Sequence, residues 1–244
     1  MNDLRQKYDL KPLVIHSNYL INLAGANDEF RRKSIAAFRG ELERGAALRA
    51  DYLVLHPGSF RGLSREEGLA LAGSAIEEAA RGVELDGLRV LIENTAGAEF
   101  SLGGTFEQIA ELIERLRGHV SVGACIDTCH THVAGYDIVS EEGRALTLRH
   151  LDKTVGLKNA HVWHCNDAKA ERGSHLDRHE HIGRGKLGLD VFRALLNDRR
   201  LKHTAFIAET PINEPGDDWR NVRALKGLVG KNWQIPKDGG RRAG

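Results

Sequence analysis

Short apolar runs alternate along the chain with longer segments in which apolar residues recur at helical spacing. The short runs predict buried strands, and the longer segments predict amphipathic helices. Strands are expected at residues 13–16, 52–56, 89–93, 122–127, 160–164 and 205–209. The clearest helices are expected at 28–50, 64–83 and 105–117. This steady alternation predicts βαβ units and a parallel sheet.

The length of 244 residues suits one barrel-type catalytic domain, which we expect to cover residues 1–230. The polar, glycine-rich stretch 231–244 is expected to be a flexible C-terminal tail. No apolar run approaches the roughly 20 residues that span a bilayer, and the first ten residues lack a signal-peptide core. We therefore expect a cytoplasmic protein that does not contact membranes.

Three cysteines are too few for a disulfide framework, and all three lie in or beside apolar runs. Cys125 and Cys129 form a C-x3-C pair, but no second pair completes a four-thiolate zinc site. We expect all three cysteines to be small buried residues. No G-x-G-x-x-G follows the first strand, so a dinucleotide-binding fold loses support.

Each of the six predicted strands ends in a residue that can bind a metal ion. In chain order these residues are His16, His56, Glu93, Asp127, His164 and Glu209, and the adjoining loops add His130, Asp177 and His179. A single histidine at a strand end is more often a hydrogen-bonded structural residue. Six out of six is different, because structural roles would not restrict every position to His, Asp or Glu. In a (β/α) barrel these ends meet at one mouth, so we predict a metal or catalytic cluster there.

The donor types narrow the choice of metal. Imidazole mixed with carboxylate suits Zn²⁺, Mn²⁺ or Fe²⁺ better than Mg²⁺ or Ca²⁺. Nine donors are too many for one ion and suit three ions that share a bridging carboxylate. Three divalent cations would outweigh the four carboxylates and leave a charge of about +2. That surplus favours an anionic substrate such as a phosphodiester, although the formal net charge of the chain is only +1.

Seven segments carry a family resemblance, and they occur in the family's order. They are HSNYLINL at 16–23, LHPGS at 55–59, IENTAG at 92–97, CIDTCH at 125–130, HCNDAK at 164–169, DRH at 177–179 and AET at 208–210. In these segments the chain resembles the endonuclease IV (deoxyribonuclease IV) family of zinc-dependent abasic-site endonucleases. The resemblance implies cleavage of double-stranded DNA on the 5′ side of an abasic site, leaving a 3′-hydroxyl, and trimming of blocked 3′ ends.

The resemblance also implies three zinc ions per chain, with Mn²⁺ an option in one site. The first site would use His16, His56 and Glu93; the second Glu93, Asp127, His164 and Glu209; the third His130, Asp177 and His179. Glu93 would bridge the first two ions. Glu93 and Glu209 are the expected catalytic residues, as acceptors of the proton of the attacking water.

Two further sets of residues are expected to bind DNA. The resemblance implies that Tyr19 and Leu20 wedge into the duplex where the abasic sugar flips out. An aromatic and an aliphatic side chain suit insertion into a base step. The alternative is ordinary apolar packing of a loop. The loop 169–186 is expected to contact phosphates, unless its cations merely face solvent. Those cations are Lys169, Arg172, Arg178, Arg184 and Lys186. Four histidines that match no ligand position are expected to be supporting or structural: His132, His161, His175 and His181.

The chain also departs from the family, whose barrel has eight strands where six are predicted here. We therefore expect an incomplete TIM-type barrel of the xylose-isomerase-like kind, without the first two βα units. Three explanations compete: a truncated gene model, a naturally shortened enzyme, or edge-to-edge pairing of strands into an oligomer. We favour truncation and expect a monomer, with an edge-paired oligomer as the alternative.

Two other functions remain open. Related barrels bind one divalent ion and act as sugar isomerases or epimerases, but such a site would leave Asp177 and His179 without a role. The second alternative is a non-catalytic remnant that binds DNA or metal, and it is suggested by the missing first two βα units. The number of metal ions per chain and turnover on abasic DNA distinguish these alternatives.

Overall fold

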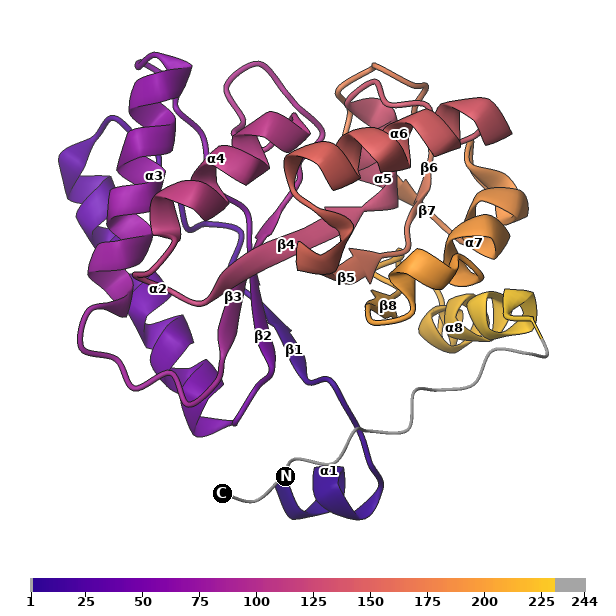
Figure 1. The fold of residues 1–244 in the computed structure, drawn as a ribbon, viewed down its shortest axis with the longest axis horizontal. Coiled ribbons are helices and arrows are strands. Elements are labelled where there is room, and N and C mark those ends of the chain that lie inside the picture. Colours follow the sequence, from indigo (N-terminus) through magenta and orange to yellow (C-terminus); the bar gives the residue numbers. More distant parts are fainter. Residues whose placement is uncertain (1, 231–244) are drawn as a thin grey trace.

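A computed structural model describes residues 2–230, and strands and helices alternate through it (Figure 1). The strands are β1 (Val14–His16), β2 (Tyr52–Leu55), β3 (Arg89–Glu93), β4 (Val122–Asp127), β5 (Ala160–His164), β6 (Asp167–Ala168), β7 (His179–Glu180) and β8 (Ala205–Ile207). The α-helices are α1 (Asn2–Lys7), α2 (Asp28–Ala47), α3 (Arg65–Ala80), α4 (Phe106–Leu116), α5 (Thr128–Val133), α6 (Glu141–Thr154), α7 (Gly188–Leu196) and α8 (Asp217–Leu228). Short 3₁₀ turns, η1 (Leu157–Asn159) and η2 (Arg199–Leu201), precede β5 and β8.

Six strands form one parallel sheet in the order β1-β2-β3-β4-β5-β8. The sheet curls without closing, and helices cover its convex side (Figure 1). This confirms the predicted incomplete barrel. The predicted C-terminal tail lies outside the described residues. Among the described helices, none combines the length and apolarity needed to cross a membrane.

Three of the predicted strands match at both ends, and two others stop short of their metal-capable residue. β2 ends at Leu55, because His56 is followed by Pro57, which has no N–H to donate. β8 ends at Ile207, because the N–H of Glu209 donates to the side chain of Asn166 at 3.0 Å instead of to β5. His56 and Glu209 therefore lie in loops that begin at the strand ends. The helices predicted at 28–50 and 64–83 each end three residues early, and the one predicted at 105–117 ends one residue early.

The alternation of side chains along the strands places the polar cluster. Val54, Leu91, Cys125 and Val162 lie side by side on the concave face as a small apolar layer. Because successive side chains point to opposite faces, the residues two positions further on share this face. Those residues are His56, Glu93, Asp127 and His164. The larger core, with Phe38, Leu42, Ile76 and Phe106, lies between the sheet and the helices.

An irregularity at the opposite end of the sheet explains one of the unassigned histidines. The β4–β5 register shifts beside Ala124, which leaves His161 as the extra residue of β5. Its ring stacks on Tyr52 at 5.4 Å, and its Nε2 lies 2.5 Å from Nη1 of Arg89. To reach them the ring passes over Gly123, where an added Cβ would lie only 2.6 Å from the ring. His161 is therefore structural and distant from the strand ends at the mouth.

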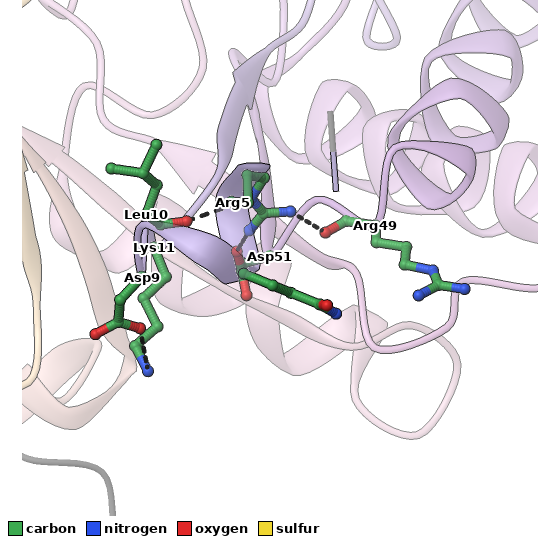
Figure 2. Close-up of a pocket in the computed structure, with 7 residues that line it drawn as sticks. Arg5, Asp9, Leu10, Lys11, Arg49 and Asp51 are labelled. Carbon is green, nitrogen blue, oxygen red and sulfur yellow. Dashed lines mark hydrogen bonds and ion pairs between the residues drawn. The ribbon is translucent and has the colours of Figure 1, made fainter. Parts of the chain in front are cut away.

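The N-terminal segment is held at this same end by Arg5 (Figure 2). Its guanidinium donates to Asp51 at 2.7 Å and to the carbonyl of Arg49 at 2.8 Å. Asp51 also accepts from the N–H of Leu13 at 2.7 Å, at the start of β1. In the pocket of about 370 Å³ beside Arg5, Arg5 is paired with Asp51 and Lys11 with Asp9, and we assign the pocket a structural role.

Candidate metal centre

The structure brings all nine predicted ligand residues together at the carboxyl ends of the strands. Their donor atoms fall into three groups in which every pair of atoms lies within 4.8 Å. The groups are His16, His56 and Glu93; Glu93, Asp127, His164 and Glu209; and His130, Asp177 and His179. These are the three sets that the family resemblance implies.

Glu93 joins the first two groups. Its Oε2 lies 3.0 Å from Nε2 of His16 and 3.1 Å from Nε2 of His56. Its other oxygen, Oε1, lies 2.9 Å from Nδ1 of His164. The two oxygens of a fully buried carboxylate therefore face two different sets of donors. This is the arrangement that a carboxylate bridging two cations requires.

The third group lies beside the first two and is more open. Asp177 places Oδ2 3.2 Å from Nε2 of His130 and Oδ1 3.2 Å from Nε2 of His179. Asp177 is about half exposed, whereas His130 is buried. His130 also lies 3.5 Å from Oε1 of Glu93, which connects this group with the bridging carboxylate.

Backbone carbonyls orient three of the histidines. Nδ1 of His16 lies 2.8 Å from the carbonyl of Ser17, and Nδ1 of His130 lies 2.9 Å from that of Asn94. His179 repeats the pattern with the carbonyl of Glu209 at 3.1 Å. A proton on Nδ1 in each ring leaves Nε2 as a lone-pair donor toward the cluster, which is how proteins prepare histidine to bind metals.

Two buried asparagines that the sequence did not single out position candidate ligands, and a buried aspartate holds the loop beside them. The amide of Asn166 donates to Oδ2 of Asp127, and its carbonyl oxygen accepts from the N–H of Glu209. Asn94 accepts from the N–H of Asp127 at 2.7 Å. Asp167 accepts hydrogen bonds from the N–H groups of Gly183 at 2.9 Å, Leu187 at 2.8 Å and Gly188 at 3.3 Å, and so holds the segment between β7 and α7. Asn94 directly follows a predicted strand end and Asn166 lies two residues beyond one, and this position is the signal that could have identified them.

The charges of the cluster depend strongly on one another. Burial would raise the pKa of Glu93, but His164 and the other surrounding histidines outweigh burial and hold that pKa well below its usual range. Burial would lower the pKa of His179, but the adjacent carboxylate of Asp177, together with Asp127, raises it to about 9. The pKa of Asp177 is in turn held far below its usual range by His130 and His179. Glu93 and Asp177 therefore keep their negative charges among the surrounding histidines.

The residues present fit divalent metal ions. The Nε2 atoms of His130 and His179 are buried, yet neither makes a hydrogen bond of good geometry. Buried polar atoms are rarely left in this state, and an ion beside them would satisfy both. The donor set of imidazoles and carboxylates suits zinc and similar ions.

Two of the cysteines lie close to the cluster but belong to none of the three predicted ligand sets. Cys125 and Cys129 lie near the second and third groups, but both are buried and burial raises the pKa of each thiol to about 12. Thiols, unlike thiolates, are poor metal ligands. Cys125, Cys129 and Cys165 are buried free cysteines, as predicted.

The residues predicted to bind DNA differ in exposure and in whether a carboxylate of the chain already pairs with them. Tyr19 and Leu20, between β1 and α2, are 88% and 72% exposed, so they do not pack as core residues. Three of the predicted cations already have carboxylate partners: Lys169 with Glu180 at 4.0 Å, Arg172 with Asp137 at 3.0 Å and Lys186 with Glu171 at 2.5 Å. Among residues 2–230, the Arg178 side chain donates only to a backbone carbonyl, that of Asp177, and Arg184 is exposed.

The other three unassigned histidines lie on this side of the molecule. His175 contacts the carbonyl of Ala96 at 2.9 Å, and His181 accepts from Asn221 at 3.0 Å. His132 is buried in α5, and neither ring nitrogen has a hydrogen-bond partner among residues 2–230. The first two therefore stabilise loops, and nothing in the structure explains the third.

Over most of its length the chain is similar to known proteins. The family model described as "Xylose isomerase-like TIM barrel" matches residues 2–226. A "Probable endonuclease 4" of Solibacter usitatus is 49% identical over 95% of this chain and 81% of its own length. One from Chloroflexus aurantiacus is 45% identical over 92% of this chain and 79% of its own length.

Solved structures show the same likeness. The crystal structure of endonuclease IV from Thermus thermophilus superposes with a TM-score of 0.79 at 36% identity, covering 93% of this chain and 78% of that one. A D-tagatose 3-epimerase-like protein superposes with a TM-score of 0.69 at 23% identity, over 93% of this chain and 79% of that one. The second likeness shows the fold alone.

Proposed function

Because this chain belongs to the endonuclease IV family of the xylose isomerase-like TIM barrels, we propose that it is a metal-dependent DNA repair endonuclease. Its substrate is double-stranded DNA with an abasic site or a blocked 3′ end. It hydrolyses the phosphodiester on the 5′ side of the abasic site and leaves a 3′-hydroxyl. The observation that carries this proposal is the position of Glu93, whose two oxygens face two different groups of ligands while a third group lies beside them.

The nine residues of the three groups would hold three zinc ions, with Mn²⁺ an option in one site. When bound, such ions supply Lewis-acid stabilisation of phosphoryl charge and make water a competent nucleophile at neutral pH. Glu93 holds its negative charge in a buried position and fixes the spacing of the first two groups. The backbone carbonyls behind His16, His130 and His179 keep these rings turned toward the centre.

Proton transfer falls to the carboxylates. Glu209 is 41% exposed, and its Oε2 lies 3.3 Å from Nδ1 of His164, so it reaches both the cluster and the solvent. It is therefore placed to accept the proton of the attacking water and to release that proton to bulk water. Glu93 is the second acceptor, because its oxygens lie among the donors that would surround the reacting phosphate.

Tyr19 and Leu20 provide recognition of the damage. An exposed aromatic and aliphatic pair at the rim can enter a base step, and insertion is easiest where a base is already missing. The paired cations of the loop 169–186 contribute less to binding than free cations would, whereas Arg178 and Arg184 keep their full charge for phosphates.

The test combines metal content with incision. Protein loaded with zinc should bind about three ions per chain and should cut a duplex containing a tetrahydrofuran abasic analogue only on its 5′ side. A chelator should abolish the cutting. Absence of incision by the loaded protein would overturn the proposal. In that case, about one ion per chain together with interconversion of ketoses would favour a sugar epimerase, and tight binding of the abasic duplex would favour a non-catalytic remnant.

A further inference from the structure

An aromatic platform on the rim of the mouth holds an unpaired cation. Arg61 is exposed on the loop between β2 and α3, at the same end of the sheet as the candidate metal centre. Its guanidinium lies 4.8 Å from the ring centroid of Phe100, which belongs to the loop between β3 and α4. Phe100 in turn contacts the ring of Phe60 edge-on at 5.9 Å. Within the described residues, no carboxylate pairs with Arg61.

Backbone hydrogen bonds fix this platform. The N–H of Phe60 donates to the carbonyl of Phe100 at 2.9 Å, and that of Leu102 donates to the carbonyl of Gly58 at 2.9 Å. Ser59 and Ser101 form an antiparallel bridge between the same two loops. Arg61 therefore extends from a loop that is hydrogen-bonded to its neighbour, and less conformational freedom is lost when its guanidinium binds a ligand.

The platform is also tied to the loop of Tyr19 and Leu20. Asn22, in that loop, accepts a hydrogen bond from the N–H of Ser59 at 2.9 Å. Gly58 leaves room for this contact, because a Cβ there would collide with the Asn22 side chain. Arg61 and the exposed Tyr19–Leu20 pair thus occupy one continuous rim with a fixed spacing.

Charge favours Arg61 over three of the five cations that the sequence suggested. Lys169, Arg172 and Lys186 are each offset by a carboxylate of the chain. A guanidinium over an aromatic face keeps its full charge and its N–H donors for a ligand. The ligand that such a group binds best on a rigid rim is a phosphate with two accessible oxygens.

We propose that Arg61 binds a phosphate of the nucleic-acid backbone next to the step that Tyr19 and Leu20 enter, with Phe100 holding the guanidinium in position. This inference rests on the proposed nuclease function and adds a binding residue to it. The contact is to the backbone, so it strengthens binding of damaged and undamaged duplex alike.

The test measures binding of metal-loaded protein to an undamaged, uncut duplex at several salt concentrations. Removing one phosphate contact lowers the dependence of log Kd on log salt by about 0.9, which corresponds to about 5- to 10-fold weaker binding at 0.1 M salt. We expect this change for Arg61→Ala. Arg61→Lys should keep the salt dependence, and Phe100→Leu should weaken binding less than Arg61→Ala does.

The matched control is Arg81→Ala, which removes an exposed arginine just after α3, at the opposite end of the molecule. It should bind like the unaltered protein. Equal affinity of the Arg61→Ala and Arg81→Ala variants would overturn the inference, and so would an unaltered protein that binds no duplex. If the unaltered protein binds DNA but does not incise the abasic analogue, the nuclease proposal fails, whereas the role of Arg61 is still decided by the binding data.

Discussion

The side-chain amide of Asn166 donates a hydrogen bond to Oδ2 of Asp127, one of the candidate metal ligands. Both residues are fully buried. The carbonyl oxygen of the same amide accepts the N–H of Glu209 at 3.0 Å, so one side chain sets the relative position of two ligands from different strands. Partners of this kind fix the direction of a ligand's lone pairs and contribute to metal affinity without touching the metal.

Replacement of Asn166 should therefore weaken the second ligand group. We expect Asn166→Ala to lower the affinity for zinc at one of the three sites by about 10- to 100-fold. Competition with a chromophoric chelator measures this change. Asn159→Ala is the control, because Asn159 donates to the carbonyl of Val155 at the other end of the same strand. Equal zinc affinity in the two variants would contradict a positioning role for Asn166.

Glu93 is the residue on which the most contacts of the cluster depend. In Glu93→Gln the bridging charge is lost while the volume is kept, so the first two groups should each bind zinc more weakly. We expect incision of an abasic duplex to fall by about 100-fold or more, since a direct ligand matters at least as much as its supporting residues. Elemental analysis should find fewer than two tightly bound ions per chain. Full incision by this variant would exclude Glu93 as a bridge.

The sequence was sufficient to predict that these side chains gather at one edge of the sheet, for a simple geometric reason. Residues such as Glu93 and Asp127 end apolar strands, and the carboxyl ends of neighbouring parallel strands must meet at one edge. His130 and His179 were candidates from the adjoining loops, and only family resemblance grouped them into a third site, because their positions depend on α5 and on a two-stranded hairpin, β6–β7, which has no apolar pattern.

The supporting residues were harder to predict. Asn94 and Asn166 are buried by contacts with strands distant in sequence, and an asparagine after a strand is ordinarily part of a turn. The shifted register between β4 and β5 also has no local signal, because it depends on the ring of His161 reaching Arg89 across a neighbouring strand. Such contacts become visible only when the sheet is assembled.

Gly123 provides a direct test of that assembly. A Cβ there would lie 2.6 Å from the His161 ring and 2.9 Å from the carbonyl of Asn159, closer than packed atoms approach. We expect Gly123→Ala to lower the free energy of unfolding by about 1–3 kcal/mol. Gly227→Ala in α8 meets no atom within 4 Å and should be neutral or slightly stabilising. Denaturant titration measures both, and equal stability of the two variants would contradict the close approach.

The same histidine predicts a pH dependence of stability. Burial, together with the charges of Arg89 and His203, lowers the pKa of His161 to about 4. An unfolded chain binds this proton near pH 6.5, whereas the folded chain does not until about pH 4. The stability that His161 contributes is therefore complete above pH 6.5 and is lost as the pH falls from 6.5 to 4.

The measurement compares the protein with a His161→Phe variant, both in chelator, across this range of pH. The Phe ring keeps the contact with Tyr52 but cannot take up a proton. On lowering the pH, the unaltered protein should lose more free energy of unfolding than the variant, by on the order of 1–2 kcal/mol once solvent screening is allowed for. Parallel curves for the two proteins would show that His161 does not stay neutral in the folded state.

Tyr19 and Leu20 give a prediction that separates recognition from folding. Because they are 88% and 72% exposed, replacing both with serine should leave the free energy of unfolding within about 0.5 kcal/mol of its original value. Insertion into a base step contributes only when the duplex opens, so the loss should fall on abasic DNA more than on undamaged DNA. We expect binding of the abasic duplex to weaken by about 10- to 100-fold, as loss of one or two stacking contacts of a few kcal/mol implies.

Leu146→Ser, an equally simple change at a 52% exposed position of α6, is the control and should alter neither binding nor stability. If the Tyr19/Leu20 variant still prefers abasic over undamaged DNA, damage recognition is not a property of this pair. It would then belong to the candidate metal centre, which the flipped-out sugar enters.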